Sequence, residues 1–203
     1  MYKFFKRTID LLMAIIGGII LMPLFFILWL GIRFESKGAA IFKQERAGKE
    51  GKPFTFYKFR TMRIDADPFG ASPKSGEDPR LTKVGKILRE YSLDELPQLF
   101  NIIKGDMSIV GPRPLYMSQM AEWDERQKKR LLVKPGLTGF AQIHGRGELT
   151  REQKLEYDVE YVESASFLLD MKIILATIVQ VFCRKNIYEK KYSKTEHTRG
   201  QRQ

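Results

Sequence analysis

The sequence contains almost no residues that bind zinc or form disulfide bonds. Among its 203 residues there is one cysteine, Cys183, and there are two histidines, His144 and His197. A structural zinc site or a disulfide framework within one chain is therefore excluded. Cys183 stands in an apolar run, which favours a buried thiol. Any chemistry must come from carboxylates, arginines and lysines.

The glycine-dependent nucleotide-binding fingerprints are also absent. Neither a Walker A sequence nor the dinucleotide-binding pattern occurs anywhere in the chain. The segment Gly145-Arg146-Gly147 is compatible with an anion-binding loop, although this short pattern is weakly specific. The neighbouring His144 fits a hydrogen-bonding loop residue as well as a catalytic one.

Acidic residues are outnumbered by basic ones. The chain has 35 lysines and arginines against 24 aspartates and glutamates, a net charge of +11 and a pI of about 9.7. Such a balance favours an anionic partner, which means nucleic acid, acidic lipid headgroups or a phosphorylated substrate. The hydrophobic content of 43% and the length predict one globular domain, with or without an anchor.

One stretch, residues 11–32, lacks charge altogether. It exceeds the roughly 20 residues that a bilayer core requires and is too long for a cleavable signal peptide. Pro23 near its middle removes a backbone hydrogen bond and predicts a bend. Both flanks are basic, so a spanning helix and a re-entrant helix that returns to the same face both remain open. Asp10, one turn after Lys6 and Arg7, is expected to form a local salt bridge.

Residues 40–59 predict a β-hairpin. Two strand-like segments flank a turn at residues 48–53, and the second segment alternates apolar and polar side chains. Lys58 and Arg60 are two residues apart and share a face of this strand. That face is either exposed to solvent or turned toward a phosphate.

The segment after the hairpin predicts an exposed, mobile loop. Residues 68–79 are rich in proline, glycine and serine, and such a loop could cover a site. Asp65-Ala66-Asp67 just before it matches the D-x-D metal motif of nucleotide-sugar glycosyltransferases. Because three-residue matches are common by chance, a transferase that uses this motif is kept only as a third hypothesis.

The stretch 89–114 carries the strongest chemical signal. Apolar residues at i, i+3, i+4 and i+7 predict a helix that ends at Gly105 and buries Leu96, Leu99, Phe100 and Ile103. Two acids, Asp94 and Glu95, stand at its start, and Arg113 follows its end between two prolines. Arg89 lies at the end of another predicted helix, residues 83–91, which has a cationic face.

The two acids have two interpretations. Ser92-x-x-Glu95 matches a capping box, in which acids in the first turn complement the helix dipole. Alternatively, the pair acts on a phosphate, with Asp94 attacking phosphorus while Glu95 holds a metal or orients the donor. Adjacent residues on a helix do not share a face, which suits such a division of roles.

The second half of the chain predicts further helices. Residues 117–133 predict one charged helix, and residues 150–163 predict a helix that a Thr150-x-x-Gln153 capping box opens. Residues 166–183 form an apolar pattern too interrupted to span a bilayer, which favours a helix at the membrane interface. Residues 140–143 predict a short strand. The basic tail from Arg184 is expected to be disordered.

Together these features resemble the small bacterial sugar transferases, also called monotopic phosphoglycosyl transferases. The resemblance runs from the anchor to about Lys185. It rests on ordered motifs, which are Lys6-Arg7-x-x-Asp10 before a proline-broken apolar run, Lys58-Phe59-Arg60-Thr61-Met62, Ser92-Leu93-Asp94-Glu95-Leu96-Pro97-Gln98, Lys104-Gly105-Asp106-Met107-Ser108-x-Val110-Gly111-Pro112-Arg113-Pro114, Lys134-Pro135-Gly136-Leu137-Thr138-Gly139-x-Ala141-Gln142 and Phe167-Leu168-Leu169-Asp170.

Members of that family transfer a sugar 1-phosphate from a UDP-sugar to a polyprenyl phosphate, usually undecaprenyl phosphate, and release UMP. This is the first membrane step of bacterial glycoconjugate biosynthesis, and it requires Mg²⁺. The resemblance implies that Asp94 attacks the β-phosphorus to form a covalent intermediate, that Asp94 and Glu95 hold the metal, and that a re-entrant anchor is kinked at Pro23. Our hypotheses for the other substrate-binding residues are Arg89, Arg113, Lys58, Arg60, Arg146 and Asp170, the last of which orients an arginine.

The overall prediction is an α+β, mostly helical, monotopic membrane protein with a re-entrant helix, a small β-hairpin and interfacial amphipathic helices. We expect an anchor at 1–37, a catalytic domain at 38–185 and a tail at 186–203, on the cytoplasmic face of the bacterial inner membrane. Its expected partners are a UDP-sugar, undecaprenyl phosphate and membrane lipids, but no nucleic acid. The competing hypothesis is a non-catalytic, membrane-anchored basic module that binds nucleic acid or acidic lipid. The sequence leaves the sugar, the glycan pathway and the oligomeric state open, a homo-oligomer included.

Overall fold

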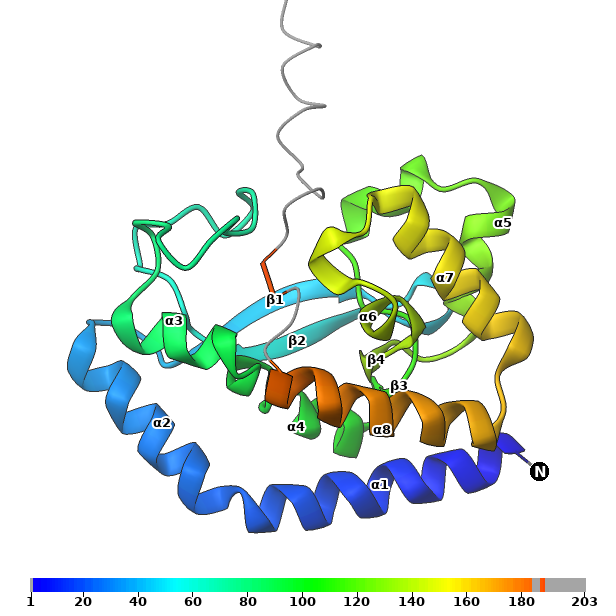
Figure 1. Ribbon diagram of the computed structural model, residues 1–203, viewed down its shortest axis with the longest axis horizontal. Coiled ribbons are helices and arrows are strands. Elements are labelled where there is room, and N and C mark those ends of the chain that lie inside the picture. Colours follow the sequence, from blue (N-terminus) through cyan, green and yellow to red (C-terminus); the bar gives the residue numbers. More distant parts are fainter. Residues whose placement is uncertain (1, 184–186, 189–203) are drawn as a thin grey trace, which may run out of the picture.

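The computed structural model describes residues 2–183 and 187–188 and is mostly helical, with two small sheets (Figure 1). Its helices are α1 (Tyr2–Ile20), α2 (Met22–Glu35), α3 (Lys83–Glu90), α4 (Gln98–Lys104), α5 (Glu125–Lys128), α6 (Phe140–Ile143), α7 (Arg151–Ser164) and α8 (Phe167–Cys183). Its strands are β1 (Ile41–Ala47), β2 (Pro53–Phe59), β3 (Ser108–Val110) and β4 (Gly136–Thr138). Short 3-10 turns occupy Lys49–Gly51, Leu93–Glu95, Met117–Glu122, Lys129–Leu132 and Arg146–Glu148. The mostly helical class with a small hairpin is confirmed, and the expected tail lies almost entirely outside the described residues.

The N-terminal apolar stretch forms two helices that run along one side of the molecule (Figure 1). They meet at Leu21 with a bend of 62°. Pro23 lies in the first turn of α2, where its missing N–H leaves the carbonyl of Ile19 without its helical donor. Within the described residues no single helix is both long and apolar enough to cross a bilayer, whereas this bent pair together meets that test of length and composition. The bend expected at Pro23 is confirmed.

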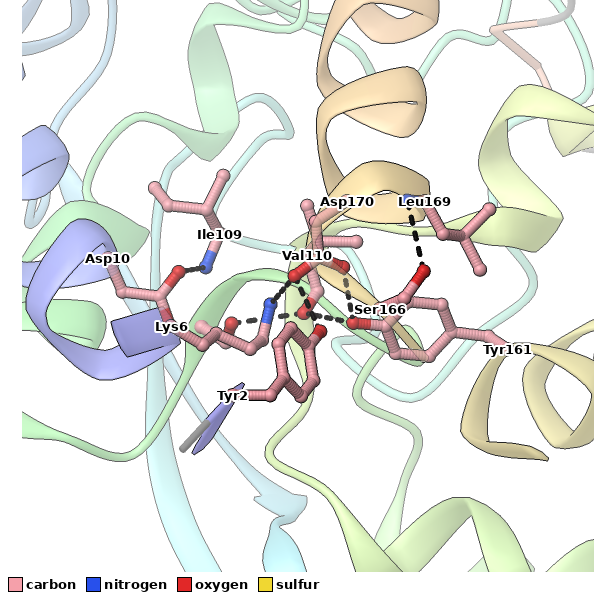
Figure 2. Close-up of polar contacts among 10 residues, drawn as sticks. Tyr2, Lys6, Asp10, Ile109, Val110, Tyr161, Ser166, Leu169 and Asp170 are labelled. Atoms are coloured by element: carbon pink, nitrogen blue, oxygen red, sulfur yellow. Dashed lines mark hydrogen bonds and ion pairs between the residues drawn. The ribbon is translucent and has the colours of Figure 1, made fainter. Parts of the chain in front are cut away.

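Charged side chains of α1 contact distant elements of the fold. The carboxylate of Asp10 accepts a hydrogen bond from the N–H of Ile109 at 3.0 Å (Figure 2). Arg7 donates to the carbonyls of Ile102 and Ile103, at 2.6 and 3.0 Å, at the end of α4. The local salt bridge expected for Asp10 is therefore wrong, because β3 supplies a backbone donor that the buried carboxylate satisfies.

The expected hairpin is present. β1 and β2 pair antiparallel with Gln44 opposite Phe56. The edge of β2 is covered by Asn101 of α4, which accepts from the N–H of Tyr57 at 3.1 Å and donates to the carbonyl of Thr55 at 2.7 Å. Because unpaired strand edges need partners, this one buried side chain fixes α4 against the hairpin.

The second sheet differs from the prediction of a strand at residues 140–143. β3 pairs in parallel with β4, and residues 140–143 form α6 instead. The two strands approach closely at glycines, since a Cβ atom on Gly136 would lie 2.1 Å from the backbone nitrogen of Gly111. This close contact between distant segments places the strand at residues 136–138 and not at residues 140–143, and α6 begins directly after it.

Residues 117–133 do not form the single helix that was predicted. They form a 3-10 turn, α5 and a second 3-10 turn. The break follows from Asp124, whose carboxylate accepts from the N–H of Gln127 at 2.7 Å and starts a new helix. The helix α7 and its Thr150–Gln153 capping box are confirmed.

The helix α4 buries a different face from the one predicted. Leu99 and Ile102 are buried, whereas Phe100 and Ile103 are exposed, because the core side of α4 faces β2 and α1. Large exposed apolar side chains also gather on α1, α2 and α8. Cys183, at the end of α8, is exposed as well, so the expected buried thiol is wrong. The apolar run that contains it has an outward face that no described residue covers.

Candidate active site

A cavity of about 400 Å³ lies beside β2, a size that suits a small-molecule ligand. It is lined by the hairpin, the loop after β2, the Leu93–Glu95 turn, the segment after β3, and the helices α6 and α7. Around it the fold brings together most of the predicted site residues, which are Lys58, Arg60, Arg89, Asp94, Glu95, Arg113 and Arg146.

The two acids enter this cavity from the 3-10 turn that precedes α4. Ser92, just before the turn, has a left-handed φ of 56°, and its side chain caps no backbone N–H. Its hydroxyl instead accepts a hydrogen bond from Arg146 Nη2 at 3.0 Å. The capping-box interpretation is therefore wrong. Asp94 and Glu95 are only 3% and 8% exposed, and buried carboxylates require compensating charge.

Each carboxylate has its own cation. Asp94 Oδ2 lies 2.5 Å from Lys58 Nζ on β2. Glu95 accepts hydrogen bonds from both terminal nitrogens of Arg113, at 2.7 and 3.4 Å. Adjacent side chains in a 3-10 turn point roughly 120° apart, so neighbouring positions reach different partners. The geometry therefore permits the two acids to act differently.

Burial and charge have opposite effects on these groups. Burial by itself would raise the pKa of Glu95, but Arg113, Lys58 and Arg146 lower that pKa to about 2. Burial lowers the pKa of Lys58, while Asp94 and Glu95 favour its charged form. At neutral pH Glu95 is therefore an anion, as a ligand for a hard cation must be.

The two carboxylates are a donor set that suits Mg²⁺. This ion binds proteins through one or two carboxylates and completes its coordination with water and substrate phosphates. Asp94 and Glu95 offer such oxygens beside a cavity large enough for a phosphorylated substrate. No group of three or more His, Cys, Asp or Glu side chains is placed to hold a metal in the described part of the chain. Binding there would thus depend on phosphate oxygens from the substrate.

Two of the predicted arginines are fixed by hydrogen bonds to nearby segments. Arg89 donates from Nε to the hydroxyl of Thr61 at 3.0 Å. Arg60 donates to the carbonyls of Lys37 and Ser36, at 2.5 and 2.9 Å. Arg60 therefore lines the cavity but uses its guanidinium to join β2 to the segment after α2.

Asp170 lies elsewhere. Figure 2 shows its carboxylate between α1 and α7, where it accepts from Tyr2 at 2.8 Å, from Lys6 at 2.6 Å and from Tyr161 at 2.8 Å. Burial, together with Asp170, raises the pKa of the Tyr161 hydroxyl, which keeps it a donor. Its hydrogen-bond partners are one lysine and two tyrosines, so the expectation that Asp170 orients an arginine is wrong. Asp170 does not line the cavity, and its role in substrate binding stays a prediction.

Asp65 and Asp67 do not form a comparable pair. Both are exposed. Asp65 pairs with Arg63 at 3.2 Å, and the carboxylate of Asp67 turns back to accept from the N–H of Phe69 at 2.8 Å. Although Asp67 reaches the cavity, no buried carboxylate pair of the kind formed by the two acids of the 3-10 turn exists there.

Among the cavity residues that are missing from the sequence-based predictions, two buried polar ones are notable. Gln142 of α6 and Asp158 of α7 both line it and are almost completely buried. For Asp158 a signal existed, since it falls with Leu155, Val159 and Val162 on the inward i, i+3, i+4, i+7 stripe of α7. A carboxylate at such a position requires a buried partner. Gln142 had no signal of this kind because its segment was expected to be a strand.

Comparison with known proteins gives a consistent result. A family model described as bacterial sugar transferase matches residues 1–184. The chain is 45% identical to the uncharacterized sugar transferase EpsL of Bacillus subtilis (strain 168), with 83% of each chain covered. It is 43% identical to the galactosyl transferase CpsE of Streptococcus agalactiae serotype III (strain NEM316), with 85% of this chain and 41% of that protein covered. It is 40% identical to the UDP-glucose:undecaprenyl-phosphate glucose-1-phosphate transferase of Klebsiella pneumoniae, with 91% and 41% covered. The chain thus spans about two fifths of the length of the latter two.

Proposed function

The chain belongs to the bacterial sugar transferase family, and we propose that it transfers a sugar 1-phosphate from a UDP-sugar to undecaprenyl phosphate and releases UMP. One structural observation supports this proposal above all others. Asp94 and Glu95 are buried side by side at a cavity, each against its own cation. Both substrates are polyanions, so a carboxylate can approach their phosphorus only where cations offset the charge. The relative from Klebsiella pneumoniae is named for this reaction with UDP-glucose.

The reaction would proceed by two displacements at the β-phosphorus. An oxygen of Asp94 attacks and forms a carboxyl–phosphorus bond, while the bond to the bridging oxygen breaks and UMP leaves with its electron pair. A phosphate oxygen of the lipid then attacks the same phosphorus. Asp94 departs as a carboxylate, and the sugar phosphate ends on the lipid as a diphosphate. The mixed anhydride of Asp94 and the sugar phosphate suits this reaction because it can transfer the sugar phosphate to the lipid.

The side chains around Asp94 have separate roles in this scheme. Lys58 offsets the charge of Asp94 as the donor approaches. Arg113 keeps Glu95 ionised and oriented, and Arg89 and Arg146 add positive charge to the walls. Mg²⁺, when bound by Glu95 and Asp94, supplies charge neutralisation to the diphosphate.

The membrane arrangement belongs to the same proposal. We infer that α1 and α2 dip into one leaflet of the bacterial inner membrane and return, which leaves the catalytic domain on the cytoplasmic face. Both outer ends of the pair bind the same domain, since Arg7 caps α4 and the carboxylate of Glu35 accepts from the N–H groups of Lys83 and Val84 at 2.6 and 2.9 Å. A helix that crossed the bilayer would separate these ends. The 62° bend and the basic flanks support the same arrangement.

The test is UMP release by the detergent-purified protein from a panel of UDP-sugars with Mg²⁺, with and without undecaprenyl phosphate. We expect turnover that requires the lipid and falls on the order of 10³-fold or more in Asp94→Asn, while far-UV circular dichroism shows that this variant remains folded. Asp65→Asn is the matched control and should retain turnover. Substantial activity in Asp94→Asn, or equal losses in both variants, would remove Asp94 from the nucleophile role.

A further inference from the structure

One wall of the cavity contains buried polar atoms that have no partner. Both side-chain amide atoms of Gln142, Nε2 and Oε1, are buried and bond to no other described atom, and the same holds for Oδ1 of Asp158. The two residues are 9% and 3% exposed, and both line the cavity. A buried polar atom left unsatisfied costs free energy, so such atoms in a cavity wall indicate a missing ligand.

The surroundings hold Asp158 in a fixed orientation. Arg130 donates to its Oδ2 from Nε at 3.1 Å and from Nη2 at 2.7 Å, and Nη2 also donates to the backbone carbonyl of Arg113 at 2.5 Å. Arg130 itself is 3% exposed and lies over the ring of Trp123, 4.8 Å from its centroid. Oδ1 is therefore left as a preorganised acceptor. The helices α6 and α7 contact each other, and Gln142 and Asp158 line the cavity from these two neighbouring helices.

The hydrogen-bonding capacity of these atoms restricts the chemical class of the ligand. The unpartnered atoms of this wall are two acceptors, Asp158 Oδ1 and Gln142 Oε1, and one donor group, Gln142 Nε2. A phosphate has only acceptors, and its natural place is beside Lys58, Arg89 and Arg113. The uracil edge carries a single N–H, too few for two acceptors. Sugar hydroxyls each donate and accept, so two hydroxyls, either of the transferred sugar or of the ribose, would satisfy all three atoms. A comparison of UDP with the UDP-sugar separates these two sources.

We propose that Gln142 and Asp158 bind hydroxyl groups of the sugar in the UDP-sugar donor and thereby set which sugar is transferred. The inference rests on the proposed function, because it takes the donor to be a UDP-sugar. A site built to bind a hydroxyl strongly disfavours a donor that lacks it, since its own buried groups are then left unpaired. Differences in this wall would accordingly distinguish transferases for different sugars.

The test uses Gln142→Met, which keeps the length of the side chain and removes its polar atoms. Binding of UDP and of the preferred UDP-sugar is measured by titration calorimetry in an Asp94→Asn background, where no turnover occurs. We expect affinity for the UDP-sugar to fall about 10- to 100-fold, while affinity for UDP changes less than about twofold. Donors that lack one hydroxyl of the sugar complete a thermodynamic cycle. At least one of these deoxy donors should bind the Asp94→Asn parent more weakly than the full donor does, whereas the variant that also carries Gln142→Met should bind both donors equally.

Matched variants separate this role from a general effect. Gln98→Met removes another buried amide with an unpartnered nitrogen, but one that does not line the cavity, and it should leave the ratio of UDP-sugar to UDP affinity unchanged. Asp158→Asn replaces an acceptor-only group and should shift the preference among epimeric or deoxy donors. An equal loss of UDP affinity in Gln142→Met would assign the wall to the nucleotide, and unchanged binding of both would mean that it contacts neither. Both results overturn the inference. The absence of wild-type UMP release would instead overturn the proposed function.

Discussion

At the scale of single residues, the cavity is organised by paired charges. Lys58 neutralises Asp94, and Arg113 neutralises Glu95, so neither acid is a bare buried charge. Such pairing offsets the cost of burying a charged carboxylate in a place that water reaches poorly. A diphosphate entering the cavity would compete with the acids for these cations. Lys58 and Arg113 are therefore placed to exchange their carboxylate partners for phosphate oxygens during turnover.

The pH dependence of stability tests the pairing of Glu95. Its pKa in the folded protein is about 2, below the ordinary 4.5. A lowered pKa gives stabilisation that is fully present above about pH 4.5 and is lost as the pH falls toward 2, amounting to about 3 kcal/mol. We expect the melting-temperature difference between wild type and Glu95→Gln to shrink steadily over this range. The exposed Glu125→Gln is the control for charge removal, and a difference that stays constant from pH 6 to pH 2.5 would contradict the pairing.

At the scale of elements, α1 is held by buried polar contacts at its N-terminal end. Lys6 pairs with Asp170 of α8, and Asp10 accepts from the backbone of β3 (Figure 2). Tyr161 adds α7 to the same cluster through Asp170. Because these buried contacts satisfy the polar groups that take part in them, they hold α1 in one orientation against α7, α8 and β3.

Removing Asp170 tests this docking and the correction of its role. Asp170→Ala leaves Lys6, which is 18% exposed at its side chain, and the Tyr2 hydroxyl without their acceptor, whereas the Tyr161 hydroxyl keeps the carbonyl of Val110 at 3.2 Å. We expect a loss of about 3–5 kcal/mol, or roughly 10 °C in Tm, with kcat/KM of the folded enzyme preserved within about threefold. The exposed Asp65→Ala should change Tm little. An inactive Asp170→Ala with normal Tm would return Asp170 to the active site.

The bend between α1 and α2 leads to a second prediction at this scale. Pro23→Ala restores the backbone donor and removes a helical penalty of about 3 kcal/mol, which favours one straight helix. Residues 2–35 would then be about 50 Å long, enough to span a bilayer. We expect a fraction of the molecules to place the N-terminus on the opposite face, measured by labelling a single cysteine added before residue 1 in a Cys183→Ser background. Pro53→Ala, at the start of β2, is the control, and identical labelling of both variants would show that the domain contacts alone hold the bend.

At the scale of the whole molecule, the surface combines a net charge of +11 with many exposed apolar side chains. The apolar side chains gather on α1, α2, α4 and α8, and examples that exceed half exposure are Phe4, Phe26, Phe100, Leu175 and Phe182. Apolar area on this scale marks an interaction surface. A module that binds through its charge should lose its binding at high salt, whereas an apolar anchor should keep its membrane binding.

Vesicle flotation distinguishes the two. An anchored transferase should float with uncharged phosphatidylcholine vesicles at 1 M salt, because screening over about 3 Å removes electrostatic attraction but not burial of apolar area. We expect Leu175→Asp with Val179→Asp, two exposed positions one turn apart on α8, to reduce the bound fraction severalfold. Release of the wild type by salt alone would favour the basic module that binds nucleic acid or acidic lipid.

Local chemistry accounts for what the sequence determined by itself. The bend follows from the ring of Pro23, the hairpin from alternation around a glycine-rich turn, and the end of α4 from Gly105, whose φ is +100°. The acids Asp94 and Glu95 were recognisable because ordered motifs surround them. Each of these features depends on residues a few positions apart.

Only the tertiary structure decided the partners. Glu95 meets Arg113 from beyond α4, Asp170 meets Lys6 at the other end of the chain, and β4 forms where Gly136 crosses Gly111. Such contacts join segments between about twenty and more than a hundred and sixty residues apart, so no local pattern specifies them. The unpartnered wall formed by Gln142 and Asp158 appears for the same reason, since only packing shows which buried polar atoms lack a partner.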